Sequence, residues 1–200
     1  MYRVVILDFD GTLVRTNINW EYVRERVRKL LGLSKDAPLK PIATAVFKYY
    51  RSSEKFREAM EFIESEELRS VESAKYPHEL PQLLRELKRC GYVLALVTLR
   101  SWRTAEPLLS KLRVCDVFDV VVTRDEVPER SSQLIRVMER LGVNRGETLF
   151  IGDWVGDEEA GRAVGVRTII VRGPEEVVEL LGSLLRECRR GLVRREGLVV

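Results

Sequence analysis

Aspartates stand in pairs at two places in the sequence where a short apolar run ends. Asp8 and Asp10 follow a run near the N-terminus, and Asp153 and Asp157 follow a run in the last third of the chain. These four residues are half of the eight Asp in the sequence. A hydroxyl residue, Thr98, ends a third run. Because ligands of open parallel sheets bind at the carboxyl ends of the strands, we expect these side chains to lie together if the runs are parallel strands.

Carboxylates gathered at one edge repel one another unless a cation neutralises them. A set of carboxylate and carbonyl oxygens without His or Cys favours a hard divalent ion, and Mg²⁺ is the usual choice beside a phosphate. The single histidine, His78, excludes a His-rich metal site and is the one available imidazole base. Structural alternatives exist for each residue: Asp and Gly form turns, Asp153 or Asp157 caps a helix, and Thr98 bonds its own backbone.

The apolar runs that precede these residues alternate with segments of helical period, which predicts an α/β fold with a parallel sheet of about five strands covered by helices on both faces. The predicted strands are 2–7, 92–97, 118–122, 148–151 and 168–171. The predicted helices of the same unit are 81–90, 101–112, 131–141, 157–164 and 174–186.

The first connection is far longer than a crossover between parallel strands requires. The 83 residues between Asp8 and Tyr92 exceed the dozen or more that suffice. Apolar residues recur at helical spacing within 20–31, 42–50 and 54–68. We therefore predict a small helical subdomain, residues 15–76, inserted after the first strand into a core of residues 1–14 and 77–200.

Composition limits the partners and the cellular compartment that we expect for the protein. The 34 Lys and Arg exceed the 31 Asp and Glu by only three, too little to argue for nucleic acid. No apolar run has the length of a membrane span. The three cysteines predict reduced thiols in a cytoplasmic protein. We expect a monomer or homodimer with no membrane or nucleic-acid partner, and we interpret the Arg-rich tail, 189–200, as a final strand or a loose end.

The stretches DFDGTL, LVTLR around Thr98, and GDWVGD resemble motifs one, two and four of the haloacid dehalogenase superfamily. The resemblance runs from about residue 1 to 173 and points to the phosphatase branch with a helical cap, similar to phosphoglycolate phosphatases. It implies a Rossmann-like core, with the predicted insert as an α-helical cap that closes over the site.

The resemblance also implies roles for individual residues. Asp8 would be the nucleophile that forms an aspartyl phosphate, and Asp10 would protonate the leaving oxygen and then activate water. Thr98 would donate a hydrogen bond to the phosphoryl group. Mg²⁺ would be held by Asp8, the main-chain carbonyl of Asp10 and Asp153, with Asp157 as a further ligand or an orienting group. Because displaced halide needs no proton, the acid at position 10 favours phosphoryl transfer over dehalogenation.

Substrate binding is expected at Phe9, Gly11, Thr98 and Leu99, which lie within motifs one and two, and Gly11 lets the chain leave the strand without steric conflict. Three further features lie outside these motifs. The patch at residues 48–51, Lys-Tyr-Tyr-Arg, is a candidate contact for an anionic substrate, with packing as the alternative. Trp154 is a candidate for packing against substrate or cap, and His78 lies at the predicted hinge without an expected catalytic role.

The departure from the family pattern is motif three, where members carry a Lys. The segment 123–132 has no Lys, and we expect Arg130, or else Arg124, to replace it; a solvated surface charge is the alternative. The sequence thus predicts an Mg²⁺-dependent phosphatase acting on a small phosphomonoester. A phosphomutase, and a non-catalytic binding protein that kept the fold, are the alternatives.

Overall fold

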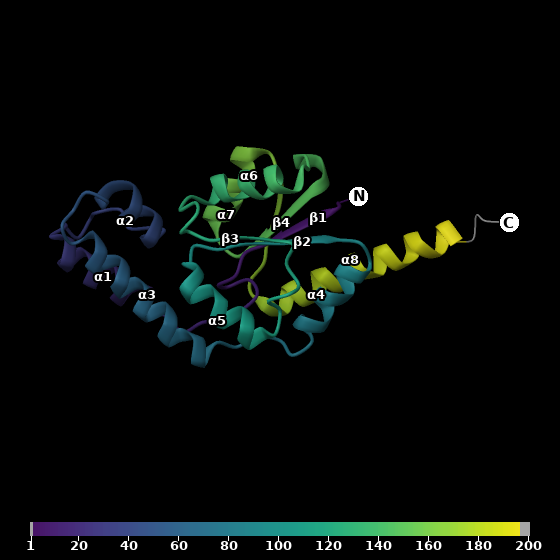
Figure 1. The fold of residues 1–200 in the computed structure, drawn as a ribbon, viewed down its shortest axis with the longest axis horizontal. Coiled ribbons are helices and arrows are strands. Elements are labelled where there is room, and N and C mark those ends of the chain that lie inside the picture. The colour runs from purple at the N-terminus through teal and green to yellow at the C-terminus, as the bar shows by residue number, and fades with distance from the viewer. Residues whose placement is uncertain (1, 197–200) are drawn as a thin grey trace.

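One parallel sheet forms the centre of the molecule. The computed structural model describes the backbone of residues 2–196 and the side chains of residues 2–190, and within them five parallel strands run in the order β3-β2-β1-β4-β5 (Figure 1). The strands are β1 (Val4–Leu7), β2 (Val93–Val97), β3 (Val120–Val122), β4 (Thr148–Gly152) and β5 (Arg167–Ile170). The predicted α/β class with about five strands is confirmed.

Helices cover both faces of this sheet because its central strands are apolar on both sides. Val5 and Leu7 of β1 pack in the cluster that includes α4 (Leu80–Arg89), α5 (Trp102–Leu112) and α8 (Pro174–Glu196). Val4 and Ile6 pack on the other face with α6 (Arg130–Leu141) and α7 (Val155–Val164). A short 3₁₀ turn, Arg145–Glu147, leads into β4. Figure 1 shows α6 and α7 above the sheet and α4, α5 and α8 below it.

Two helices of the core have a boundary that differs from the prediction by more than one residue. Helix α7 begins at Val155 rather than Asp157, so Asp157 lies inside its first turn. Helix α8 continues to Glu196, so up to that residue the Arg-rich tail is neither of the two alternatives expected, a final strand or a loose end. The helix continues because Leu185 and Cys188 carry its buried face onward beside α4. The rest of the tail, 197–200, lies outside the described residues.

The long first connection contains α1 (Trp20–Leu31), α2 (Ile42–Tyr50) and α3 (Phe56–Ser73). Their apolar side chains form a hydrophobic cluster separate from the two at the sheet, and the helices lie to one side of the sheet in Figure 1. The chain enters and leaves this region side by side, because Arg15 N donates to Lys75 O at 2.8 Å and Lys75 N donates to Arg15 O at 2.9 Å. The domain boundaries at 15 and 76 stay a prediction.

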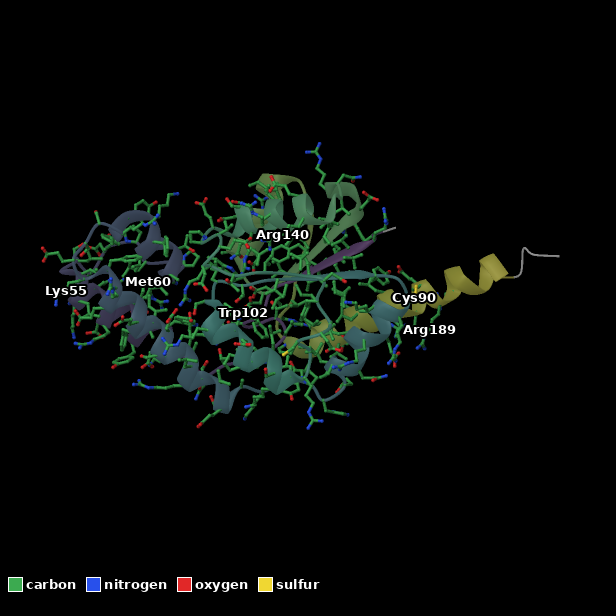
Figure 2. All side chains as sticks on the ribbon, viewed as in Figure 1. Lys55, Met60, Cys90, Trp102, Arg140 and Arg189 are labelled. Carbon is green, nitrogen blue, oxygen red and sulfur yellow. A yellow bond between two sulfur atoms is a disulfide. The ribbon has the colours of Figure 1, made fainter. Side chains whose placement is uncertain are left out.

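A disulfide joins Cys90 to Cys188, at a sequence separation of 98. The expectation of reduced thiols is therefore wrong for this pair, while Cys115 is free and exposed. Sequence spacing carries no sign of the pairing; it arises because α4 and α8 pack side by side on one face of the sheet. Figure 2 shows Cys90 and Arg189 at this junction. Within the described residues, no helix is long and apolar enough to cross a membrane.

Removing the disulfide should lower thermal stability. Its loop is long, so the unfolded chain gains much freedom when the bond is lost, and the expected cost is about 2–4 kcal/mol. For a chain of this length we expect Cys188→Ser to lower the Tm by roughly 5–15 °C. Calorimetry under oxidising conditions measures the shift, with Cys115→Ser as the control that leaves the Tm unchanged. Equal Tm values for Cys188→Ser and the parent protein would contradict the role given to the disulfide.

Candidate active site

A cavity of about 300 Å³ lies between the carboxyl edge of the sheet and the helices of the first connection. It receives side chains from both regions. From the sheet edge and its loops come Asp8, Asp10, Thr98, Leu99, Arg100, Arg130, Asp153 and Trp154; from the first connection come Trp20, Arg24, Lys40, Pro41, Ile42, Ala43 and Glu67. The aspartates of the cavity therefore come from the sheet edge, and most of its apolar side chains come from the first connection.

Strand pairing brings the acidic residues together. Because β1 pairs with β4 in a register that sets Leu7 beside Ile151, the residues that follow the two strands meet. Asp8 N continues the pairing by donating to Ile151 O at 2.9 Å. Asp8, Asp153 and Asp157 each offer one carboxylate oxygen, and these oxygens lie within 4.8 Å of one another. The gathering of these three predicted residues follows directly from the sheet topology.

Two glycines make room for this approach. A Cβ on Gly11 would lie 2.0 Å from Asp153 Oδ2, and its φ of +82° is one that other residues rarely adopt. A Cβ on Gly152 would lie 2.4 Å from Asp157 Oδ2. Any side chain at either position would push a carboxylate out of the cluster, so both glycines are required for its geometry.

Burial and mutual repulsion shift the acidity of the clustered carboxyls. Burial raises the pKa of Asp8 well above its usual range; the Arg130 guanidinium opposes this rise, and the charges of Asp157, Asp153 and Asp10 add to it. Burial, followed by the charge of Asp157, raises the pKa of Asp153 to about 6. The carboxyls thus need a compensating cation to stay ionised together near neutral pH.

Arg130, at the start of α6, supplies part of that compensation. Its Nη2 contacts Asp8 Oδ1, its Nε lies 2.8 Å from Asp157 Oδ1, and its Nη1 donates to Gln133 Oε1 at 3.0 Å. The guanidinium is buried, which lowers the pKa of Arg130, but the charges of Asp8 and Asp157 outweigh burial and raise it overall. The alternative of a solvated surface charge is wrong for this residue.

Arg124, the other candidate, points away from Asp8. Its Nη1 donates to Glu67 Oε1 at 2.5 Å and to Leu99 O at 2.8 Å. Burial raises the pKa of Glu67, and the Arg124 guanidinium acts against that rise. Arg124, in the loop after β3, and Arg130, at the start of α6, therefore bind different partners, and of these two only Arg130 contacts the carboxylate cluster.

Asp10 leaves the cluster and pairs with Arg100. Its Oδ2 accepts from Arg100 Nε at 2.6 Å, and its Oδ1 accepts from Arg100 Nη2 at 2.8 Å. Thr16 Oγ1 adds a third hydrogen bond to Oδ1 at 3.0 Å. The sequence analysis did not single out Arg100, although its position two residues after Thr98, in the same strand-end loop, was an available signal.

The remaining predicted residues of motifs one and two divide between cavity and core. Thr98 lines the cavity, and its Oγ1 accepts from Arg100 N at 3.1 Å, which leaves its hydroxyl proton free to donate. Leu99 also lines the cavity. The Phe9 side chain is fully buried in the core cluster, so a contact from Phe9 to substrate is restricted to its backbone. Gly11 is engaged in the turn, since its N–H donates to Val14 O.

Of the other residues that the sequence analysis named, some line the cavity and others do not. Trp154 lines it. The 48–51 patch does not: Lys48 instead pairs with Glu129 at 3.2 Å, and Tyr49 is exposed. The cations that the first connection does bring to the cavity are Arg24 and Lys40, which sequence reasoning missed. His78 is almost fully exposed beside Glu79, away from the cavity.

Comparison with known proteins places the fold and the motifs in context. Residues 5–171 match the family model described as haloacid dehalogenase-like hydrolase. The chain is 29% identical over 181 residues to a phosphoglycolate phosphatase of Aquifex aeolicus, with 84% of each chain covered. It is 30% identical over 187 residues to pyrophosphatase PpaX of Bacillus mycoides, covering 84% of this chain and 83% of that one.

Solved structures show the same fold. A haloacid dehalogenase-like family hydrolase from Streptococcus pneumoniae superposes with a TM-score of 0.61 at 19% identity, over 90% of both chains.

The donor set fits a hard divalent cation. Asp8, Asp153 and Asp157 supply carboxylate oxygens only, the ligand type that Mg²⁺ prefers. Asp157 Oδ1 is buried and accepts no hydrogen bond from any described residue, despite its closeness to Arg130 Nε. One guanidinium faces three carboxylates, so the cluster retains a negative charge that a divalent ion would neutralise.

Proton competition gives this metal site a testable pH dependence. The pKa of Asp153 is higher in the folded protein than in the unfolded chain, so without metal the folded state binds more protons between about pH 4 and 6, and this carboxyl's contribution to stability falls as pH rises through that window. Since Mg²⁺ must displace those protons, we expect added Mg²⁺ to raise the Tm at pH 7.5 and to raise it much less at pH 5.

Thermal denaturation with and without Mg²⁺ at the two pH values measures this effect. Asp153→Asn should abolish the rise at pH 7.5, and Asp116→Asn, a change of an exposed carboxylate outside the site, should preserve it. A rise of equal size at both pH values would contradict the assignment of these carboxylates to the metal.

Proposed function

The chain belongs to the haloacid dehalogenase-like hydrolases, and on that basis we propose that it is a phosphatase that hydrolyses a small phosphomonoester through a covalent intermediate on Asp8. The observation that carries the proposal is the position of the Asp8 carboxylate. It lies at a strand end, contacts Arg130 and borders a cavity that also receives Asp10 and Asp153. The phosphatase relatives support the same reaction type.

In the first step a carboxylate oxygen of Asp8 attacks phosphorus. The bond between phosphorus and the substrate's ester oxygen breaks, and Asp10 gives a proton to that oxygen, so the alcohol leaves neutral. In the second step Asp10 takes a proton from water as the water attacks phosphorus. The bond between phosphorus and Asp8 then breaks, which restores both carboxyls and releases phosphate.

Charge compensation is the main demand of this chemistry, because a carboxylate must approach an anionic phosphate. Arg130 holds Asp8 by one nitrogen and remains buried next to the phosphoryl position. A Mg²⁺ ion held by Asp8, the Asp10 carbonyl, Asp153 and Asp157 would supply further neutralisation and orient the phosphate. The Arg130 contacts weaken the case for a non-catalytic protein, whose motivation was the missing Lys of motif three.

Hydrogen-bond donors for the phosphoryl oxygens are present at the same edge. The Thr98 hydroxyl lines the cavity, and the backbone N–H groups of Phe9 and Leu99 have no acceptor within the described residues. Donors fixed by the fold before substrate binds stabilise developing negative charge without reorganisation. We assign Thr98, Phe9 and Leu99 to phosphoryl binding on these grounds, with Phe9 contributing its backbone only, while Gly11, whose N–H donates to Val14 O, shapes the turn beside them.

The cap side of the cavity limits the substrate. A cavity of about 300 Å³ admits a small metabolite. Arg24, Lys40 and Trp20 of the first connection line this cavity. A phosphomonoester with a second anionic group would find a cation there. The cytoplasmic location and the monomeric or homodimeric state stay predictions.

Phosphate release from a panel of phosphorylated metabolites tests the proposed function. We expect Mg²⁺-dependent release that stops with EDTA and returns with excess Mg²⁺, and we expect Asp8→Asn to lose at least about 1,000-fold in kcat, because the amide is no nucleophile. Members of the panel with a second anionic group should have the lowest KM. Asp116→Asn should keep full activity. Turnover that survives both EDTA and Asp8→Asn would eliminate the proposal.

Arg130 gives a second test, because substitutions at this position can change the shape of the side chain with or without removing its positive charge. Arg130→Lys keeps a cation near Asp8 and should retain activity within roughly tenfold of the parent protein. Arg130→Gln removes the charge and should lower kcat by about 100-fold or more. Steady-state kinetics at saturating Mg²⁺ measures both variants, with circular dichroism as the control for folding. If a folded Arg130→Gln matched the parent protein, Arg130 would have no part in the reaction.

A further inference from the structure

Arg100 is a buried cation whose three guanidinium nitrogens all donate hydrogen bonds. The side chain is 2% exposed. Nε and Nη2 hold the two oxygens of Asp10 at 2.6 and 2.8 Å. Nη1 donates to the backbone oxygen of Glu67 at 3.1 Å, and Nη2 also donates to Ser70 Oγ at 3.0 Å. One side chain therefore joins a carboxylate of the sheet edge to two acceptors on α3.

The two acceptors on α3 are held in place by further contacts. Glu67 and Ser70 lie one turn apart, and Ser70 Oγ donates to Glu67 O at 2.6 Å. The Glu67 side chain is buried and accepts from Arg124 Nη1 at 2.5 Å and from Thr104 Oγ1 at 2.8 Å. This end of α3 is thereby attached to the loops after β2 and β3 through buried charged groups.

The direction of the Asp10 carboxylate depends on this attachment. A guanidinium is planar, and its paired nitrogens fix the plane of the carboxylate that they hold. The plane of Arg100 is fixed in turn by Glu67 O and Ser70 Oγ. A displacement of α3 would take away the two acceptors that this helix gives to the buried guanidinium, which is costly, so α3, Arg100 and Asp10 are expected to move together.

We propose that Arg100 is the positioning residue for Asp10, and that through Arg100 the docking of α3 on the core sets the carboxyl that protonates the leaving group. The inference rests on the proposed function, in which Asp10 donates that proton. Arg100 touches Asp10 and α3 and takes no bond-making part in the reaction. Its loss should therefore impair the proton transfer and leave phosphoryl binding and the metal carboxylates intact.

Leaving-group dependence distinguishes this role from a structural one. 4-Nitrophenyl phosphate and 4-nitrobenzyl phosphate are similar in size, but nitrophenolate leaves without a proton, whereas the benzylic alkoxide requires one. We expect Arg100→Gln to lower kcat/KM for the benzyl ester about 100-fold and for the phenyl ester less than about threefold, the usual size of a general-acid contribution setting the difference. Arg100→Lys should recover part of the loss for the benzyl ester.

The experiment measures kcat/KM of the full-length protein with Mg²⁺ on both esters. Asp10→Asn is the reference and should show the same leaving-group dependence. Asp116→Asn is the control, because its exposed carboxylate lies outside the network of Asp10, Arg100 and α3, and it should leave both values unchanged. The Mg²⁺-induced rise in Tm should be the same in Arg100→Gln as in the parent protein.

Each contrary outcome has one meaning. Equal losses on both esters in Arg100→Gln, with a leaving-group difference in Asp10→Asn, would overturn the positioning role and leave the proposed function standing. Equal losses in Asp10→Asn would overturn the role of Asp10 itself, and the inference with it. Should Arg100→Gln fail to fold, Ser70→Ala removes one anchor of Arg100 and should lower the benzyl value alone by about fivefold; an unchanged ratio of the two values would overturn the proposal.

Discussion

Uncompensated negative charge at the carboxyl edge of the sheet is the constraint around which this molecule is arranged. The pairing of β1 with β4 forces Asp8, Asp153 and Asp157 together, and burial raises the pKa of Asp8 and Asp153. Gly11 and Gly152 are required because any side chain there would collide with those carboxylates. The start of α6 then brings one guanidinium into the cluster, and a divalent cation bound there would complete the compensation that the proposed chemistry needs.

A second set of buried charged groups lies between the sheet edge and α3, and it is subject to the same requirement that each charge has a partner. Arg100 and Arg124 lie on loops of the sheet edge, and each finds its acceptors on α3, a helix of the first connection. Burying charged groups at this contact is tolerable only when each has a partner, so the contact fixes the docking of that end of α3. It also holds the Asp10 carboxylate against Arg100 at the cavity, apart from the cluster of Asp8, Asp153 and Asp157, although the Asp10 charge still contributes to the raised pKa of Asp8.

The sequence predicted the elements and the strand-end residues because both are encoded locally. Apolar runs identified the strands, and parallel topology then required their terminal Asp and Thr residues to meet. Contacts between residues that lie far apart in the sequence could not be predicted. Choosing between Arg130 and Arg124 needed the knowledge that Glu67, nearly sixty residues earlier, faces Arg124. The Cys90–Cys188 pair, the cavity cations of the first connection and the full length of α8 likewise depend on packing between distant segments.

Arginine at position 130 suits this site because the three nitrogens of its guanidinium each have a different neighbour. Nη2 contacts Asp8, Nε lies beside Asp157, and Nη1 donates to Gln133. Gln133 Nε2 in turn donates to the backbone oxygens of Thr98 and Val127, at 2.8 and 2.9 Å. An ammonium at the same place has one nitrogen and reaches fewer of these groups. The first turn of α6 therefore joins Asp8, the proposed nucleophile, to the backbone of Thr98 in one hydrogen-bonded unit, a fixed arrangement that a single ammonium would not provide.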